Sequence, residues 1–162
     1  MAEFWDVYDI NGNKTGKIVQ RDKDWLQEGE FHMGASAFIT DGQDNFLIQQ
    51  RSFSKKQAPG KWSNTGGSAL AGEDKTQCIL REIYEELGIK LTAEKLKFLK
   101  SYVYKNVFIN VFVAYVDKQI KIIKQTEEVE QTKWVSRQQL QEIYKKGEFF
   151  HPFTNELLLN IR

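Results

Sequence analysis

Cysteine is almost absent from this sequence, because Cys78 is the single thiol among 162 residues. One thiol cannot form an internal disulfide, which excludes a cross-linked scaffold within this chain. Cys78 stands beside Ile79 and Leu80 in a segment with helical periodicity. This setting favours a small buried packing residue over a reactive thiol.

The net charge is also small, +1, since 23 Lys and Arg residues oppose 22 Asp and Glu residues. No overall field attracts nucleic acid or an anionic membrane surface. The longest apolar run, residues 107–116, is interrupted by Asn110 and is far shorter than the roughly 20 residues of a membrane helix. The first residues lack the basic stretch and apolar run of a secretory signal. We therefore expect a cytoplasmic protein with no nucleic-acid or membrane partner.

Apolar residues suffice for one core, because 41% of the chain is hydrophobic and 13% is aromatic. Low-complexity and long polar stretches are missing, so disorder is not expected. A chain of this length fits a single domain over residues 1–162.

Strands and helices are expected in mixed order. Alternating apolar residues and turn signals predict an N-terminal β-hairpin, two further strand pairs, a short late strand and a polar loop. Helical periodicity and capping residues predict three helices. The strands are expected at residues 4–10, 17–21, 36–40, 46–50, 96–104, 107–116 and 133–135, the loop at 51–61, and the helices at 74–87, 137–146 and 153–161. This order indicates an α+β fold, an α/β/α sandwich.

Three carboxylates share one face of the helix expected at residues 74–87. At about 100° per residue, Glu85 and Glu86 lie within about 60° of Glu82, and the aliphatic side chains occupy the opposite arc. Like charges at these spacings cost about 0.2–0.5 kcal/mol per pair. No lysine follows at a matching offset, so a bound divalent cation is the better compensator. Oxygen ligands alone favour Mg²⁺ or Mn²⁺.

The segment around these acids resembles the Nudix box, G-x5-E-x7-R-E-U-x-E-E-x-G-U, where U is aliphatic. Every specified position matches. The matching residues are Gly67, Glu73, Arg81, Glu82, Ile83, Glu85, Glu86, Gly88 and Ile89. The resemblance implies a Nudix fold, with a mixed sheet between helices, and an enzyme that hydrolyses a diphosphate linkage in a small molecule.

The same resemblance implies roles for individual residues. Glu82, Glu85 and Glu86 would bind the divalent ion together with the main-chain carbonyl of Gly66, and the Glu73–Arg81 pair would hold the motif in shape. Members of the family often form homodimers. The general base is left open between Glu86 and three later acids, of which Glu128 ranks above Glu127 and Glu130.

Residues outside the box narrow the branch. Trp5-Asp6-Val7, His32 and residues 61–65 resemble the isopentenyl-diphosphate-isomerase-like side of the superfamily. Where such isomerases carry a catalytic cysteine and a metal-binding histidine, residues 66–69 read Gly-Gly-Ser-Ala. A hydrolase acting on a nucleoside diphosphate linked to another moiety is therefore the leading interpretation. An isomerase, and a catalytically silent sensor of a nucleotide-like metabolite, are the alternatives.

Basic side chains before the box are candidates for phosphate contacts. Arg51 ends an expected strand, and Lys61 follows the polar loop. Both are predicted to bind substrate phosphates. The substrate itself stays open, because the residues near the positions that mark ADP-ribose or dinucleoside polyphosphate enzymes match neither pattern.

Overall fold

A seven-stranded mixed sheet forms the centre of this computed structural model, which describes residues 2–150 and 154–161. Its strands are β3 (His32–Thr40), β4 (Asn45–Arg51), β5 (Trp62–Ser63), β6 (Thr65–Ser68), β7 (Leu96–Tyr104), β8 (Val107–Tyr115) and β9 (Val129–Ser136). The helices are α1 (Lys75–Leu87), α2 (Arg137–Lys145) and α3 (Thr154–Leu158), with a 3-10 turn at Ala93–Lys95.

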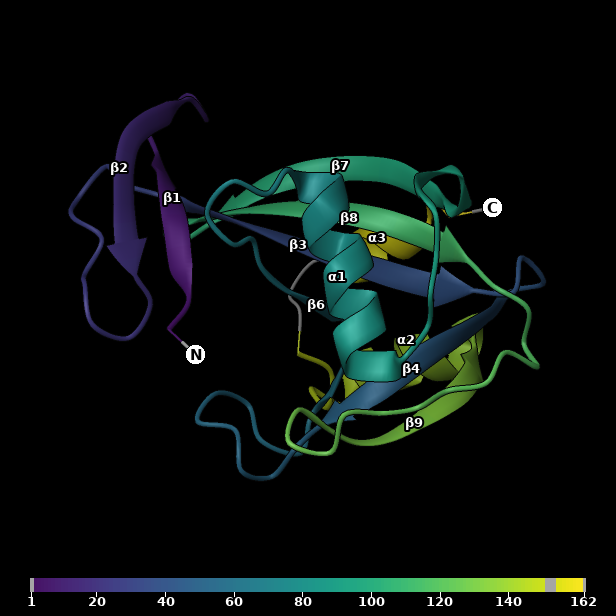
Figure 1. Ribbon diagram of the computed structural model, residues 1–162. Coiled ribbons are helices and arrows are strands. Elements are labelled where there is room, and N and C mark those ends of the chain that lie inside the picture. The colour runs from purple at the N-terminus through teal and green to yellow at the C-terminus, as the bar shows by residue number, and fades with distance from the viewer. Residues whose placement is uncertain (1, 151–153, 162) are drawn as a thin grey trace.

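The sheet is mixed because β3 runs parallel to β8, whereas its other pairings are antiparallel. The main strand order is β5-β4-β3-β8-β7, with β6 added to β3 and β9 added to β4. Helix α1 lies in front of the sheet in Figure 1, and α2 and α3 lie behind it. The predicted α+β sandwich is confirmed.

Alternation along β3 divides the core between the two faces of the sheet. Ala35, Ala37 and Ile39 pack in a cluster with α1, whereas Phe38 packs in a second cluster that includes Leu140 of α2. Successive strand side chains point to opposite faces, so one strand serves both layers. Cys78 is fully buried in the α1 cluster, as expected for a packing residue.

The predicted N-terminal hairpin is present as β1 (Phe4–Tyr8) and β2 (Lys14–Gln20), which form a separate two-stranded sheet. It stands beside the sandwich in Figure 1. The Asp6 carboxylate accepts a hydrogen bond from the Gly72 amide at 2.8 Å, and the Phe4 carbonyl accepts one from the Ala71 amide at 2.7 Å. The hairpin is thus tied to the loop before α1.

Local signals set the limits of α1. The Asp74 side chain accepts hydrogen bonds from the amides of Thr76 and Gln77. The Gln77 side chain in turn accepts one from the Asp74 amide, which completes a capping box. Gly88 ends the helix in the left-handed conformation at φ 68°. A side chain at φ > 0 is strained, so glycine is the favoured residue at this position. The predicted helix agrees with the observed one to within its capping residue.

Several predicted strand and helix limits are wrong. β3 begins at His32 rather than at residue 36, and β9 begins at Val129 rather than at residue 133. Glu130 therefore lies in a strand, not in a loop. Its exposed position on β9 explains why the apolar alternation is missing there. The last helix spans Thr154–Leu158 only, and residue 153 lies outside the described residues. None of the described helices is long and apolar enough to span a membrane.

Candidate active site

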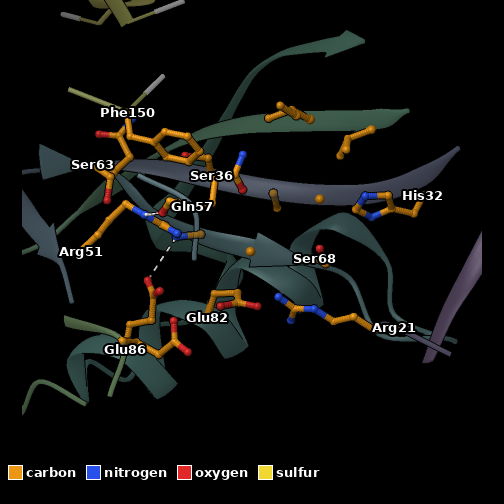
Figure 2. A pocket seen from close by; sticks show the side chains of 18 of the residues that line it. Arg21, His32, Ser36, Arg51, Gln57, Ser63, Ser68, Glu82, Glu86 and Phe150 are labelled. Carbon is orange, nitrogen blue, oxygen red and sulfur yellow. Dashed lines mark hydrogen bonds between the residues drawn. The ribbon is translucent and has the colours of Figure 1, made fainter. Parts of the chain in front are cut away.

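A cleft opens where the central sheet divides. β3 pairs with β6 along residues 34–37 but with β4 only at Ile39 and Thr40, so β4 and β6 separate beyond this point. The cleft has a volume of about 730 Å³, which is typical of small-molecule sites. Its walls come from β1, β3, β6, α1 and the loops around residues 51–57, 104–107 and 125–128. Glu82 and Glu86 face it from α1 (Figure 2).

Arg81 organises the acidic side of the cleft. Its Nε and Nη2 donate to the two carboxylate oxygens of Glu73 at 2.7 and 3.0 Å, and Nη2 also donates to the Ser68 carbonyl at 2.9 Å. Nη1 donates to Glu82 at 2.8 Å and to Glu85 at 2.9 Å. Burial lowers the pKa of Arg81, but these acids outweigh burial and raise it. The expected Glu73–Arg81 pair is present and joins the loop to the helix.

Glu86 lies deeper than the other two acids and is held by neutral groups. Gln49 donates from Nε2 to Glu86 Oε2 at 2.8 Å, and the Gly66 amide donates to the same oxygen at 3.3 Å. Thr65 orients Gln49 by donating to its Oε1 at 3.1 Å. Burial raises the pKa of Glu86 to about 8, and it also raises the pKa of Glu82.

The two glycines of β6, Gly66 and Gly67, lie in close contact with β3 and with the Glu82 side chain. A Cβ on Gly67 would come within 2.4 Å of the Glu82 carboxylate. A Cβ on Gly66 would come within 2.3 Å of the Ala35 carbonyl oxygen. Both distances are far below van der Waals contact, so a Cβ at position 66 would clash with fixed main-chain atoms, whereas a Cβ at position 67 would displace the Glu82 carboxylate.

A bound cation was preferred because no lysine follows at a matching offset, but Arg81 bonds to both Glu82 and Glu85 and offsets part of their charge. Glu86 has no cationic partner within salt-bridge distance among the described residues. The donor set fits a hard divalent cation, since it consists of carboxylates and a cation would favour their charged forms. Across residues 2–150 and 154–161, no three acidic, His or Cys side chains lie close enough to hold one ion as placed.

The loop side of the cleft carries Arg51 and Glu128. Arg51 donates from Nε to the Gln57 carbonyl at 3.0 Å, and its guanidinium lies 4.7 Å from the Phe150 ring centre. Glu128 forms an ion pair with Lys55. Both line the cleft, Arg51 as a predicted phosphate contact and Glu128 as a predicted general base.

Other candidates lie elsewhere. Lys61 donates from Nζ to the Gly147 carbonyl at 2.9 Å and is not among the described residues that line the cleft. Its predicted phosphate contact is not supported by this position. Glu127 and Glu130 are exposed and, within the described chain, do not line the cleft either. Gly88 acts as the helix cap and lies outside the cleft.

The hairpin side of the cleft brings together Trp5 and His32, which were named above for their resemblance to the isomerase-like branch, and two residues that the sequence did not indicate, Glu3 and Arg21. The Trp5 and His32 rings stack with centres 4.1 Å apart and an angle of 8°. Arg21 lies 5.8 Å from the Trp5 ring and pairs with Glu3 at 2.6 Å, and all four residues line the cleft. Burial lowers the pKa of His32 to about 4, so its imidazole is neutral near pH 7. No local pattern connects residues 5 and 32, which is why the sequence did not reveal the pair.

Comparison with known families agrees with this fold and cleft. The model of the NUDIX domain matches residues 30–157. A Listeria monocytogenes protein described as an uncharacterized Nudix hydrolase, lmo0368, is 32% identical, with 99% of this chain and 95% of that protein covered. The chain therefore belongs to the Nudix family and is an enzyme of the Nudix hydrolase class.

The isomerase-like branch is also represented among the similar proteins. An isopentenyl-diphosphate Delta-isomerase from Rhodobacter capsulatus is 33% identical, with 78% of this chain and 77% of the isomerase covered. The solved structure of DR0079 from Deinococcus radiodurans shares the fold with a TM-score of 0.79 at 21% identity, covering 98% of this chain and 99% of that one. The predicted place in the superfamily is confirmed.

Proposed function

We propose that this enzyme hydrolyses, with Mg²⁺ or Mn²⁺, the diphosphate linkage of a nucleoside diphosphate joined to another moiety. The observation that carries the proposal is the placement of Glu82 and Glu86 in the cleft beside Gly66 and Gly67. Nudix hydrolases act on small-molecule diphosphates and generally use divalent cations. When bound, such a cation neutralises diphosphate charge and lowers the pKa of a bound water.

Different residues would bind the cation, bind the phosphate and accept the proton. Glu82, Glu85 and Glu86 would hold the cation with the Gly66 carbonyl, and Arg81 would release Glu82 and Glu85 in part while keeping Glu73. Arg51 would bind a phosphate oxygen, since a guanidinium suits that geometry. Glu128 is our first choice for accepting the proton of the attacking water, because it lines the same cleft as the acids of α1.

The sequence at residues 66–69 disfavours isomerisation. Moving a double bond requires a proton donor and acceptor flanking it, and Gly66 and Gly67 have no side chain for either role. Similarity to the Rhodobacter isomerase keeps this activity as the second candidate. A silent sensor is disfavoured, since binding alone does not need three convergent glutamates on one helix.

A substrate panel tests the proposal. Nucleotide sugars, dinucleotides, dNTPs and prenyl diphosphates are incubated with Mg²⁺ in ¹⁸O-labelled water. We expect one label on a phosphoryl product of a nucleoside diphosphate derivative, and no allylic product from isopentenyl diphosphate. Allylic product with no phosphorus product from any nucleotide would refute the hydrolase assignment.

A further inference from the structure

A closed set of hydrogen bonds includes Glu86. Gln49 donates from Nε2 to Glu86 Oε2 at 2.8 Å, and its Oε1 accepts from the Thr65 hydroxyl at 3.1 Å. The Gly66 amide, which follows Thr65 in the chain, donates to the same Glu86 oxygen at 3.3 Å. These four residues therefore join three elements of the fold, β4, β6 and α1.

Gln49 spans the place where the central sheet divides. β4 and β6 both pair with β3, but within the described chain they do not pair with each other. Leu47 packs in the α1 cluster, and alternation along β4 places Gln49 on the same face of the sheet. The side-chain bonds of Gln49 thus connect β4 to β6 and α1 where main-chain pairing does not.

Gln49 and Thr65 lie outside the cleft itself. They are 3% and 2% exposed, and neither is among the described residues that line the cleft. A substrate in the cleft therefore has no contact with either side chain. Any effect of the two residues on the reaction has to pass through Glu86, which does line the cleft.

The hydrogen bonds give Glu86 one defined orientation. In the ionised form that binds a cation, a carboxylate only accepts, so Gln49 must present its NH₂ group to Glu86 and its oxygen to Thr65. Both donors meet Glu86 Oε2, whereas Oε1 accepts no hydrogen bond from the described residues. One oxygen is thus engaged, and the other is available to a cation.

A neutral amide suits this position better than a cationic side chain. Arg81 offsets part of the charge of Glu82 and Glu85, and a lysine or arginine at position 49 would do the same to Glu86. The Gln49 amide can orient the carboxylate and leave its full negative charge for a divalent ion.

We propose that Gln49 and Thr65 are positioning residues for the cation, which hold Glu86 so that Oε2 is engaged and Oε1 binds the metal. This assignment rests on the proposed function for the cation and adds two residues that do not touch the substrate. The Thr65 side chain acts on Glu86 through Gln49, so its contribution should disappear when Gln49 is replaced.

Manganese binding tests the assignment in the absence of any substrate. The metal-free protein is titrated with Mn²⁺, and the free ion is measured by electron paramagnetic resonance. Gln49→Met keeps the length of the side chain and removes the donor, so it should raise Kd about tenfold, as is usual when a partner of a metal ligand is lost. Thr65→Val should raise Kd less, and the double variant should bind no more weakly than Gln49→Met alone.

Gln50→Met is the matched control. Gln50 is the next residue on β4, makes two side-chain hydrogen bonds of its own, and is not among the described residues of the cleft. Its replacement should leave Kd unchanged. Equal Kd values for Gln49→Met and the unaltered protein, or additive losses in the double variant, would overturn the assignment.

Two further outcomes separate this assignment from the proposed function. If Gln49→Met does not fold, an unchanged Kd in Thr65→Val overturns the assignment in its place. The expected changes in Kd, combined with no cleavage of any compound in the substrate panel, would refute the proposed hydrolysis and support the roles of Gln49 and Thr65.

Discussion

The two sides of the cleft hold their charged side chains in different ways. On the α1 side, Arg81 is bonded to three carboxylates and a main-chain carbonyl. On the loop side, Lys55 meets Glu128 in one pair, and Arg51 has one hydrogen bond to a main-chain carbonyl.

The α1 side therefore holds its charged side chains in fixed positions, whereas the charged side chains of the loop side can change partners. A group fixed by several bonds loses little freedom when it engages a reacting atom, which suits metal binding and phosphoryl chemistry. A group with one partner can exchange that partner for a ligand. We therefore assign metal binding to the α1 side and recognition of the substrate to the loop and hairpin sides, with Glu128 as the proton acceptor on the loop side.

The largest expected effect tests the assignment of metal binding to α1. Glu82→Gln and Glu86→Gln should each lower kcat at least about a hundredfold, the usual effect of losing one electrostatic element of a site. Folding should persist, because glutamine has nearly the same volume. Steady-state kinetics with saturating Mg²⁺ measures the effect.

Glu142→Gln on the exposed side of α2 is the control for these two variants and should retain full activity. Chelation of the metal should abolish activity in the unaltered protein. Full activity of either α1 variant, or of the chelated enzyme, would contradict the metal assignment.

Substitutions of Gly66 and Gly67 should give the next largest effects, one on stability and the other on activity. Gly66→Ala places its Cβ against main-chain atoms of Ala35, which cannot yield cheaply, and should destabilise the fold by about 3 kcal/mol. Gly67→Ala meets the flexible end of Glu82, so the fold should tolerate it while kcat falls.

Thermal unfolding and kinetics on the two glycine variants measure both quantities. A Gly67→Ala variant with unchanged kcat would show that the position of the Glu82 carboxylate is not important for the reaction.

A third prediction concerns the hairpin side and the pH. Burial lowers the pKa of His32 to about 4, below its ordinary 6.5. Between pH 4 and pH 6.5, His32 is protonated in the unfolded chain but not in the folded chain. Stability that is present above pH 6.5 is therefore lost as the pH falls toward 4. The His32 contribution between pH 7 and pH 5 is about 2 kcal/mol.

Urea unfolding in chelator at these two pH values measures the His32 contribution as the difference between the protein and His32→Asn. The variant should lose less stability on acidification. An identical loss in both proteins would mean that His32 is protonated in the folded state.

The α1 side could be predicted from sequence because its determinants are local. Asp74 and Gly88 mark the helix ends, and the spacing of Glu82, Glu85 and Glu86 fixes their face. The pairing of Arg81 with Glu85 follows the same four-residue spacing, and it was missed because only lysines were considered as partners. The helical spacing was thus sufficient to predict the Arg81–Glu85 ion pair as well.

The other sides could not be predicted because they form through distant contacts. Trp5 meets His32 only after β1 has been tied to the loop before α1. Phe150 reaches Arg51 across about a hundred residues of chain, and Lys61 turns away to the carbonyl of Gly147. Side-chain direction at such positions depends on tertiary packing, which no local pattern reports.

The smallest expected effect tests whether Lys55, on the loop side of the cleft, contributes only to recognition of the substrate. Lys55→Ala removes the partner of Glu128, and a partly exposed ion pair contributes about 0–1 kcal/mol to stability. We expect the melting temperature to change little and KM to change more than kcat, because Lys55 lines the cleft but takes no part in the proton transfer assigned to Glu128. Lys56→Ala, at the exposed neighbouring position, is the control and should leave both constants unchanged. If Lys55→Ala lowered kcat as strongly as Glu82→Gln, Lys55 would itself belong to the chemical machinery, and its assignment to recognition of the substrate would be wrong.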